Sequence, residues 1–243
     1  MATEVAPGVH RLGNEIVNFY LVDADGGLLL VDAGMPGFYA QLESLLRSRG
    51  RSVADIDALL LTHAHPDHVG IAERVRAAGV PVRVHDADVG QARTGKSHPR
   101  EGGMLRHLRH RATWRLLATG ARNGALKPVK IAEVTPFTEG ELDVPGRPRV
   151  VHTPGHSPGH VALHFAQQGA LIAGDALCTY NPLTGRMGPQ LMPGAFAWSN
   201  DRAMDSLGRL EGMDVEVLLV GHGDPWTAGA GAAVARAREA GPS

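Results

Sequence analysis

The stretch Thr62-His63-Ala64-His65-Pro66-Asp67-His68 places three imidazoles and a carboxylate directly after an apolar run that ends at Leu61. That run predicts a short buried strand, so the polar residues lie where the strand ends. Imidazole and carboxylate are the donors that zinc and similar divalent ions prefer. Spacing by two directs His63 and His65 to one side of an extended chain, and Pro66 lets the following residues turn. We interpret the stretch as part of a metal site rather than as a pH-sensitive cluster of surface histidines.

Other short motifs also follow apolar segments and carry donors of the same kinds. In the loop Thr153-Pro154-Gly155-His156-Ser157-Pro158-Gly159-His160, two Pro-Gly pairs predict a tight turn that aims His156. Asp175 and His222 each stand beside glycine, where backbone segments can approach closely. Each signal is weak alone and gains weight by completing the set. We expect Asp32, in Val31-Asp32-Ala33-Gly34, and His160 to support ligands rather than bind metal.

Composition excludes several classes of protein. The chain has 243 residues, of which 43% are hydrophobic and 20% charged, with a net charge of −1, which is typical of a globular protein and not of a disordered one. Its aliphatic runs are strand-sized, and its first eight residues lack the features of a secretory signal. The single cysteine, Cys178, cannot form an intrachain disulfide, and we expect a buried thiol rather than a nucleophile. These features favour a cytoplasmic location.

The order of apolar segments predicts an α/β protein with one domain over residues 1–243. Strands alternate with helices in two successive halves, about 1–130 and 131–243, without a fixed-period repeat. The expected strands are residues 15–23, 27–32, 57–62, 82–85, 149–153, 161–165, 170–173 and 215–220. The expected helices are residues 41–49, 69–78, 104–119, 201–210 and 232–240.

A strongly basic segment interrupts the first half. Residues 90–130 contain ten basic residues and one acidic residue, Glu101. One interpretation is a helical lid that attracts an anionic substrate, with Arg106 and Arg109 contributing to its field. The other is a solvated helical face. Trp114 is expected either to cap an apolar pocket or to join the core, and residues 191–198 either to line an acyl pocket or to pack the body.

Together the motifs resemble, in order and over Asp32 to His222, those of the metallo-β-lactamase-fold hydrolase superfamily. The resemblance implies a four-layer αββα sandwich with the active site at one edge between the sheets. It also implies a binuclear centre whose two ions are zinc, or alternatively iron or manganese. The implied ligands are His63, His65 and His156 for one ion, Asp67, His68 and His222 for the other, and Asp175 as the bridge. The implied nucleophile is a hydroxide between the ions, oriented by Asp67 as the catalytic residue.

Differences between this sequence and individual branches of the superfamily reduce the number of reactions that we expect. Superfamily β-lactamases usually carry cysteine or serine where Asp175 stands, and the RNA-processing branches carry an added domain for which the chain has no room. Glyoxalase II and the persulfide dioxygenases share the ligand set, but residues 179–186 differ from their Gly-Cys-Gly-Arg stretch. We therefore expect hydrolysis of a small ester, thioester or lactone, and the substrate is expected to be anionic if the basic segment is a lid.

Alternative functions stay open at this point. The first is an iron-dependent oxygenase of the persulfide-dioxygenase kind on the same ligands. β-Lactam or phosphoester hydrolysis is a further alternative. A module that binds partners through the basic segment is the last, and its binding to a nucleic acid would weaken steeply with salt. We expect neither a nucleic-acid partner nor a membrane partner.

Overall fold

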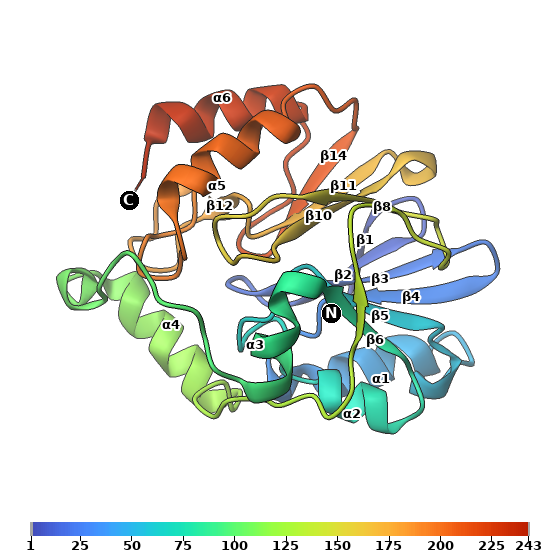
Figure 1. Ribbon diagram of the computed structural model, residues 1–243. Helices are drawn as coiled ribbons and strands as arrows, with labels where there is room; N and C mark the ends of the chain where they lie inside the picture. The colour runs from blue at the N-terminus through green and yellow to red at the C-terminus, as the bar shows by residue number, and fades with distance from the viewer. Residues whose placement is uncertain (1, 243) are drawn as a thin grey trace.

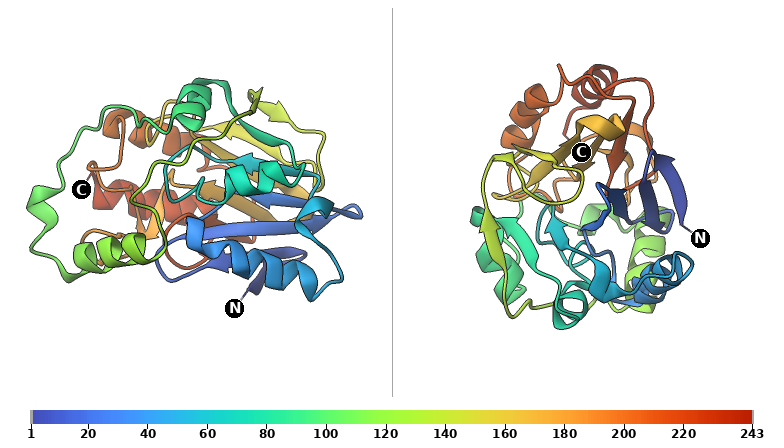
Figure 2. Two further views of the ribbon diagram at one scale, coloured as in Figure 1. Left: turned by 90° about the horizontal axis from the view of Figure 1, so that it is seen from below. Right: turned by 90° about the vertical axis from the view of Figure 1, so that its right-hand side faces the viewer.

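Two mixed β-sheets packed face to face form the centre of the molecule, and helices cover the outer side of each sheet (Figure 1). The computed structural model describes residues 2–242. Figure 2 shows the same layers from two further directions, with α1 and α2 outside one sheet and α5 and α6 outside the other. The arrangement confirms the predicted four-layer αββα sandwich.

The first sheet contains seven strands within the described residues, in the order in which they occur along the chain. β1 to β4 pair antiparallel, whereas β4 to β7 pair parallel. Its strands are β1 (Thr3–Ala6), β2 (Val9–Gly13), β3 (Asn18–Ala24), β4 (Gly27–Val31), β5 (Ala58–Leu61), β6 (Val82–His85) and β7 (Thr135–Phe137).

The second sheet has five strands in the order β14-β11-β10-β9-β8, and a two-stranded ribbon, β12-β13, lies apart from it among the described residues. β11 and β14 run parallel, and the other pairs are antiparallel. These strands are β8 (Gly140–Glu141), β9 (Arg149–His152), β10 (Val161–Phe165), β11 (Ala170–Gly174), β12 (Cys178–Tyr180), β13 (Met187–Gln190) and β14 (Val217–Val220).

The helices are short and connect or cover the strands. They are α1 (Tyr39–Arg47), α2 (Ala72–Ala77), α3 (Val89–Thr94), α4 (Arg111–Arg122), α5 (Asn200–Ser206) and α6 (Ala230–Ala240). Within residues 2–242, none of them combines the length and apolar character needed to cross a bilayer.

Strand β4 shows why the fold has four layers. All but the first of its residues are buried, because alternate side chains point to opposite faces and both faces are covered. Leu28 and Leu30 pack with α1 in the outer core, whereas Leu29 and Val31 join the core between the two sheets. In the second sheet, β14 places Leu218 in the outer core beneath α5 and α6.

Polar contacts join the two sheets at one edge of the sandwich. The backbone N–H of Val161 donates to the carbonyl of Thr62 at 2.9 Å, which links β10 to the end of β5. The Tyr20 hydroxyl donates to the carbonyl of Val220 at 2.7 Å, and the amide of Asn18 donates to the same carbonyl at 2.9 Å. All three links are buried, so each satisfies groups that have lost water.

The expected helix over residues 104–119 is wrong in its boundaries. The chain forms a 3-10 turn at Leu105–His107, is extended at His110, and then forms α4. The hydroxyl of Thr113 lies within hydrogen-bond distance of the carbonyls of His107 and Leu183, and contact with a carbonyl six residues back requires an interruption of the helix between the two residues. As a result Leu105 is 83% exposed, although its spacing predicted a shared apolar face with Leu108, Ala112 and Leu116.

The change from one sheet to the other also comes later than the expected boundary at 130/131. β7 pairs parallel with β6 and so belongs to the first sheet, because Phe137 completes the core between the sheets. The short strands β1, β2, β7, β8, β12 and β13 were not predicted. Strand β3 begins at Asn18 rather than at Glu15, since Asn14 to Val17 form a turn closed by a hydrogen bond between their backbones.

Gly70 generates the first testable prediction. A Cβ added there would lie 2.4 Å from Gly34 O and equally close to backbone atoms of Met35 and Pro36, so the loop after β4 must move. We expect Gly70→Ala to lower the free energy of unfolding by about 2 kcal/mol, measured by denaturant melts followed by circular dichroism.

Gly90 provides the matched control. It is exposed in α3 with nothing within 4 Å of an added Cβ, so Gly90→Ala should leave stability unchanged or raise it by up to about 1 kcal/mol. Equal stability of the two variants would show that the contact at Gly70 does not constrain the fold.

Candidate metal centre

Seven candidate ligands converge at the edge of the sandwich where strands of both sheets end. His63, His65, Asp67 and His68 follow β5, and His156 lies in the loop between β9 and β10. Asp175 follows β11, and His222 follows β14. Because β11 and β14 run parallel, their carboxyl ends lie side by side. The structure therefore brings together every residue that the sequence predicted as a ligand.

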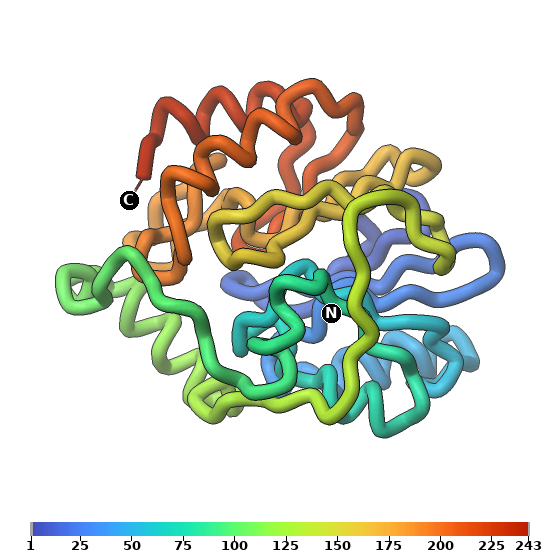
Figure 3. Tube along the Cα trace, viewed as in Figure 1, coloured from blue at the N-terminus to red at the C-terminus, as the bar shows by residue number. Residues whose placement is uncertain are grey.

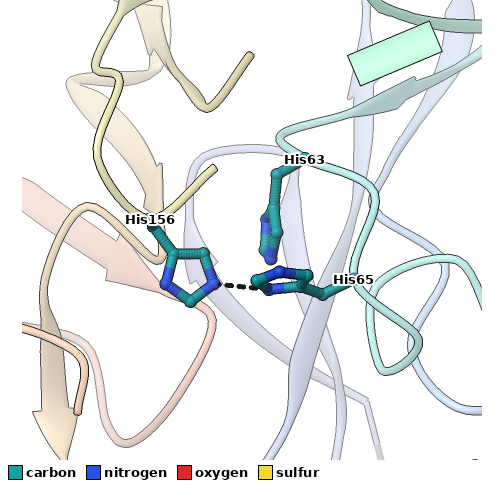
Figure 4. Close-up of side chains that lie close together, drawn as sticks. All are labelled: His63, His65 and His156. Carbon is teal, nitrogen blue, oxygen red and sulfur yellow. Dashed lines mark hydrogen bonds between the residues drawn. The ribbon is translucent and has the colours of Figure 1, made fainter. Parts of the chain in front are cut away.

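Three histidines form the first group of donors (Figure 4). One ring nitrogen from each of His63, His65 and His156 lies within 4.8 Å of the others. His65 Nδ1 and His156 Nε2 are 2.7 Å apart, and the His63 ring stands edge-on to both. This convergence of nitrogens is the arrangement that a tetrahedral cation requires.

Burial keeps the first group neutral. It lowers the pKa of His63 and of His156 well below the ordinary value, and it lowers the pKa of His65 to about 4 although Asp67 and Asp175 oppose the shift. A neutral imidazole offers a lone pair to a cation, whereas an imidazolium does not. The group is therefore ready to bind a metal ion at neutral pH.

The second group consists of Asp67, His68 and His222, again with donor atoms within 4.8 Å of one another. His222 Nε2 lies 3.5 Å from Asp67 Oδ2. His68 and His222 are fully buried, whereas Asp67 is partly exposed. Within the second group, the Asp67 carboxylate is therefore the part that contacts solvent.

Asp175 lies between the two groups. Its Oδ2 is 3.2 Å from His156 Nε2 in the first group and 3.2 Å from His222 Nε2 in the second. Its Oδ1 is 3.6 Å from His68 Nε2. Although burial alone would raise it, the imidazoles of His222 and His68 hold the pKa of Asp175 well below its usual range. The carboxylate is therefore charged and placed to bridge two cations.

Asp175 also sets the charge of the second group in the metal-free protein. Burial disfavours a cation on His68, but the carboxylates of Asp175 and Asp32 raise the pKa of His68 to about 10. The pKa of His222 is likewise raised against burial, chiefly by Asp175. Protons on these rings compensate the buried negative charge that metal ions would otherwise compensate.

The donor set fits divalent cations. His63 Nε2, His68 Nε2 and Asp175 Oδ1 are buried and have no hydrogen-bond partner among residues 2–242. Buried polar atoms are rarely left unpaired in native proteins, so three at one point indicate a partner that is not a protein group. Imidazole nitrogens with a shared carboxylate suit zinc and iron alike.

Hydrogen bonds outside the cluster orient the ligand rings. His222 Nδ1 lies 2.6 Å from the carbonyl of Ile16, which can only accept, so the proton is on Nδ1 and Nε2 faces the cluster. His68 Nδ1 donates in the same way to Asp32 Oδ2 at 2.9 Å. Such partners fix the tautomer of a metal-binding histidine and raise its basicity.

Asp32 and His160 occupy the supporting positions predicted for them. Asp32, in the left-handed region at φ 59°, accepts from the backbone and hydroxyl of Thr62 as well as from His68. His160 Nε2 accepts from the backbone N–H of Asp175 at 2.9 Å, and burial lowers its pKa to about 3, so that nitrogen stays an acceptor. Neither ring nor carboxylate belongs to the donor groups.

Close packing explains the glycine beside His222. A Cβ on Gly221 would lie 2.1 Å from Asp175 Oδ1 and 2.7 Å from the His68 ring, so any side chain there would displace the centre. This confirms the close approach of backbone that the sequence indicated at this position.

Asp88 is a supporting residue that the sequence analysis missed. Its buried carboxylate accepts from the Ser157 hydroxyl at 2.6 Å and from the Gly159 N–H at 2.8 Å, which holds the His156 loop against the first half of the chain. Burial raises its pKa. Gln91 acts similarly by donating to the carbonyl of Ala64. No local sequence signal marks either residue, because each acts on a loop distant in sequence.

A cavity of about 170 Å³ opens onto the centre. His65, Asp67, His156, Asp175 and His222 form its polar end. The remaining walls are mostly apolar and come from Met35, from α4 and the turn after it, and from residues 182–196. A concave apolar site with a few convergent polar groups is typical of a small-molecule site.

The basic segment contributes to this cavity through different residues than expected. Arg100 lines the cavity, whereas Arg106 and Arg109 do not, and Arg106 lies at a separate surface hollow. Figure 3 shows the chain after α3 passing toward the residues before α5. Trp114 neither caps the pocket nor joins the core: it is 58% exposed, and its ring N–H donates to the carbonyl of Leu108.

Residues 191–198 contribute both to the wall of the cavity and to the packing of the second sheet. Met192 and Phe196 line the cavity, whereas Leu191 packs in the outer core of the second sheet. Cys178 is fully buried, and burial raises the pKa of its thiol well above the ordinary value, which agrees with a packing role rather than a nucleophilic one.

Comparison with known proteins gives relatives that share most of the chain. Probable metallo-hydrolase YflN of Bacillus subtilis (strain 168) is 27% identical over 241 residues, which cover 92% of this chain and 87% of the relative. Uncharacterized protein YobT of the same organism is 30% identical over 219 residues, which cover 85% of this chain and 83% of the relative.

Solved structures of the same fold are also similar to this chain over most of its length. Metallo-beta-lactamase family protein TTHA1429 from Thermus thermophilus is 28% identical with a TM-score of 0.68, over 96% of this chain and 79% of that one. TTHA1623, solved in a di-iron-bound form, is 30% identical with a TM-score of 0.61, and the match covers 89% of this chain and 92% of that one. Residues 12–222 match the model of the metallo-beta-lactamase superfamily, and this span contains all seven candidate ligands. The chain belongs to the metallo-beta-lactamase superfamily.

Proposed function

We propose that the protein is a binuclear zinc hydrolase that cleaves an ester, thioester or lactone in a small molecule. The observation that carries this proposal is the position of Asp175, whose Oδ2 lies 3.2 Å from a histidine of each donor group. A carboxylate shared in this way supports two ions rather than one. Under this assignment, His63, His65 and His156 hold one ion, and Asp67, His68 and His222 hold the other.

The overall reaction needs only water as co-reactant. The oxygen of water bonds to the acyl carbon, the bond from that carbon to the leaving oxygen or sulfur breaks, and the proton ends on the leaving group. The products are an acid with an alcohol or thiol, or a hydroxy acid from a lactone. Two bound divalent ions would supply a water of lowered pKa and a polarised carbonyl.

Asp67 carries the catalytic role among the protein's own groups. It lines the cavity and is more exposed than Asp175 or the ligand histidines, so it can meet both water and substrate. A carboxylate oxygen accepts hydrogen bonds, so Asp67 would orient an attacking water by accepting a hydrogen bond from its O–H. Asp32 positions the centre through His68 without reaching the cavity.

Iron is the alternative metal, and one observation favours it: the relative TTHA1623 is known in a di-iron-bound form. The same imidazole and carboxylate donors suit iron, and an iron centre would be compatible with an oxygenase. Metal analysis of the protein purified from its own host separates the two candidates.

The metal assignment predicts two equivalents of metal per chain. We expect elemental analysis of metal-replete protein to give two ions, and a chelator to abolish hydrolysis that added zinc restores. His63→Ala should hold about one ion or fewer, because it removes a buried nitrogen from the first group.

His110→Ala is the matched control, since His110 precedes α4 and belongs to none of the donor groups. It should keep two ions. Wild-type protein that saturates with one ion, or a His63→Ala variant that holds as much metal as His110→Ala, would contradict the binuclear centre.

The role of Asp67 predicts that Asp67→Asn loses turnover out of proportion to metal. The amide is a poor acceptor for orienting water, so we expect kcat to fall by about 100-fold or more. Kinetics on the best ester or thioester should be measured beside metal content for each preparation.

Asp205→Asn serves as the control, because Asp205 is exposed on α5 and outside the cavity. Its kcat should match the wild type. An Asp67→Asn variant that kept near wild-type kcat would remove Asp67 from the mechanism while leaving the metal assignment intact.

A further inference from the structure

The cavity at the metal centre has mostly apolar walls. Apart from the candidate ligands at its polar end, one positively charged residue lines it. Its walls include Leu116, Leu117 and Leu126 from α4 and the residues after it, and Met192 and Phe196 from the residues before α5. Apolar walls of this kind stabilise a hydrocarbon group by removing it from water. They offer no partner for a polar chain.

Arg100 is the charged exception. Within residues 2–242 it is the only lysine or arginine that lines the cavity, although residues 90–130 contain ten basic residues. Its guanidinium carbon lies 5.9 Å from the centre of the Phe196 ring, and Nη2 donates to Ser97 Oγ at 3.5 Å. Among the described residues the structure records no carboxylate paired with it.

The backbone beside Arg100 is hydrogen-bonded to the segment that carries Phe196. The N–H of Glu101 donates to the carbonyl of Ala197 at 3.1 Å, and that of Gly102 donates to the carbonyl of Gly194 at 2.9 Å. Glu101 also accepts from the N–H of Asn200 through its carboxylate. These bonds hold the backbone next to Arg100 against the segment that carries Phe196, and the Arg100 side chain itself is exposed at the mouth of the cavity.

The size of the cavity limits what fills it. At about 170 Å³ it slightly exceeds the engineered 150 Å³ protein cavity that binds benzene. It is smaller than the ~300–1,000 Å³ of typical drug-sized sites. The space inside the cavity therefore suits a chain of about four to six carbons.

We propose that the substrate is an anionic ester or thioester, in which a short apolar chain joins the scissile carbonyl to a carboxylate that Arg100 binds. The inference rests on the proposed hydrolase function and adds the substrate class to it. Arg100 acts as a specificity residue, since a guanidinium presents paired N–H donors that match a carboxylate. The carbonyl then lies at the polar end beside Asp67, with the chain against Leu116 and Phe196.

The test compares matched pairs of esters on three proteins. One pair carries the charge on the acyl side, 4-nitrophenyl hydrogen adipate and neutral 4-nitrophenyl hexanoate. A second pair carries it on the leaving side, hexanoyl esters of 4-hydroxybenzoate and of 4-methylphenol. The proteins are wild type, Arg100→Gln and the control Arg106→Gln, which removes a charge from the same segment outside the cavity.

The expected result is a change in preference and not a general loss. Arg100→Gln should lower kcat/KM for the hydrogen adipate ester by about tenfold, mainly through KM, because a charge-assisted hydrogen bond to the acyl-side carboxylate is lost. The ester of 4-hydroxybenzoate, which carries its charge on the leaving side, should be affected less. The neutral members should change less than twofold. Arg106→Gln should match the wild type, and metal content should be equal in all three proteins.

A binding measurement separates this inference from the hydrolase function. Calorimetry with adipic acid monoanilide and with hexananilide, which resist hydrolysis, reports the charge preference without turnover. If no ester is hydrolysed but the anionic anilide binds tighter in an Arg100-dependent way, the hydrolase proposal fails and the ligand class stands. If esters are hydrolysed with no preference for the anion, or Arg100→Gln affects charged and neutral members equally, the inference is overturned.

Discussion

The structure depends on a buried carboxylate that must be compensated. Asp175 is only 2% exposed, and an isolated charge at that depth would cost several kcal/mol in desolvation. Histidines from both halves surround it, with His156 and His222 each 3.2 Å from the same oxygen. Asp175 therefore requires positive charge at the junction of the sheets, and metal ions or protonated imidazoles are the groups that supply it there.

Buried polar contacts also join the two halves at the edge where Asp175 lies. Each half holds the other's ligands or loops through buried polar contacts. Asp88 in the first half binds the Ser157 hydroxyl beside His156, and Thr62 accepts from the Val161 N–H at the start of β10. Such bonds are stronger in a region that excludes water, and the loss of any of them would leave a buried polar group without a hydrogen-bond partner. Hydrogen bonds thus hold the loops that carry the ligands, and the cavity opens onto the centre.

Much of this centre could be predicted from the sequence because its signals are local. An apolar strand followed by His63-Ala64-His65 specifies both the burial of the strand and the side on which the two rings lie. Asp175 and His222 have the same context of strand and glycine, and the fold family supplied their order. The central strands were predicted for the same reason, since short apolar runs buried on both faces depend little on their partners. Asp32 and His160 were also placed correctly as supports.

Other features depend on contacts between distant residues, and only the tertiary structure decided them. The edge strand β7 exists because Phe137 pairs beside β6, and the helix expected over 104–119 breaks where Thr113 binds His107. The residue of the basic segment that reaches the cavity is Arg100, because hydrogen bonds to residues 194 and 197 anchor its neighbours. By itself the sequence determined which donors could bind metal. The resemblance to the family already implied Asp175 as the bridge, whereas the packing of the two sheets determined how close that carboxylate lies to its partners and how deeply it is buried, and burial makes the charge and its partners interdependent.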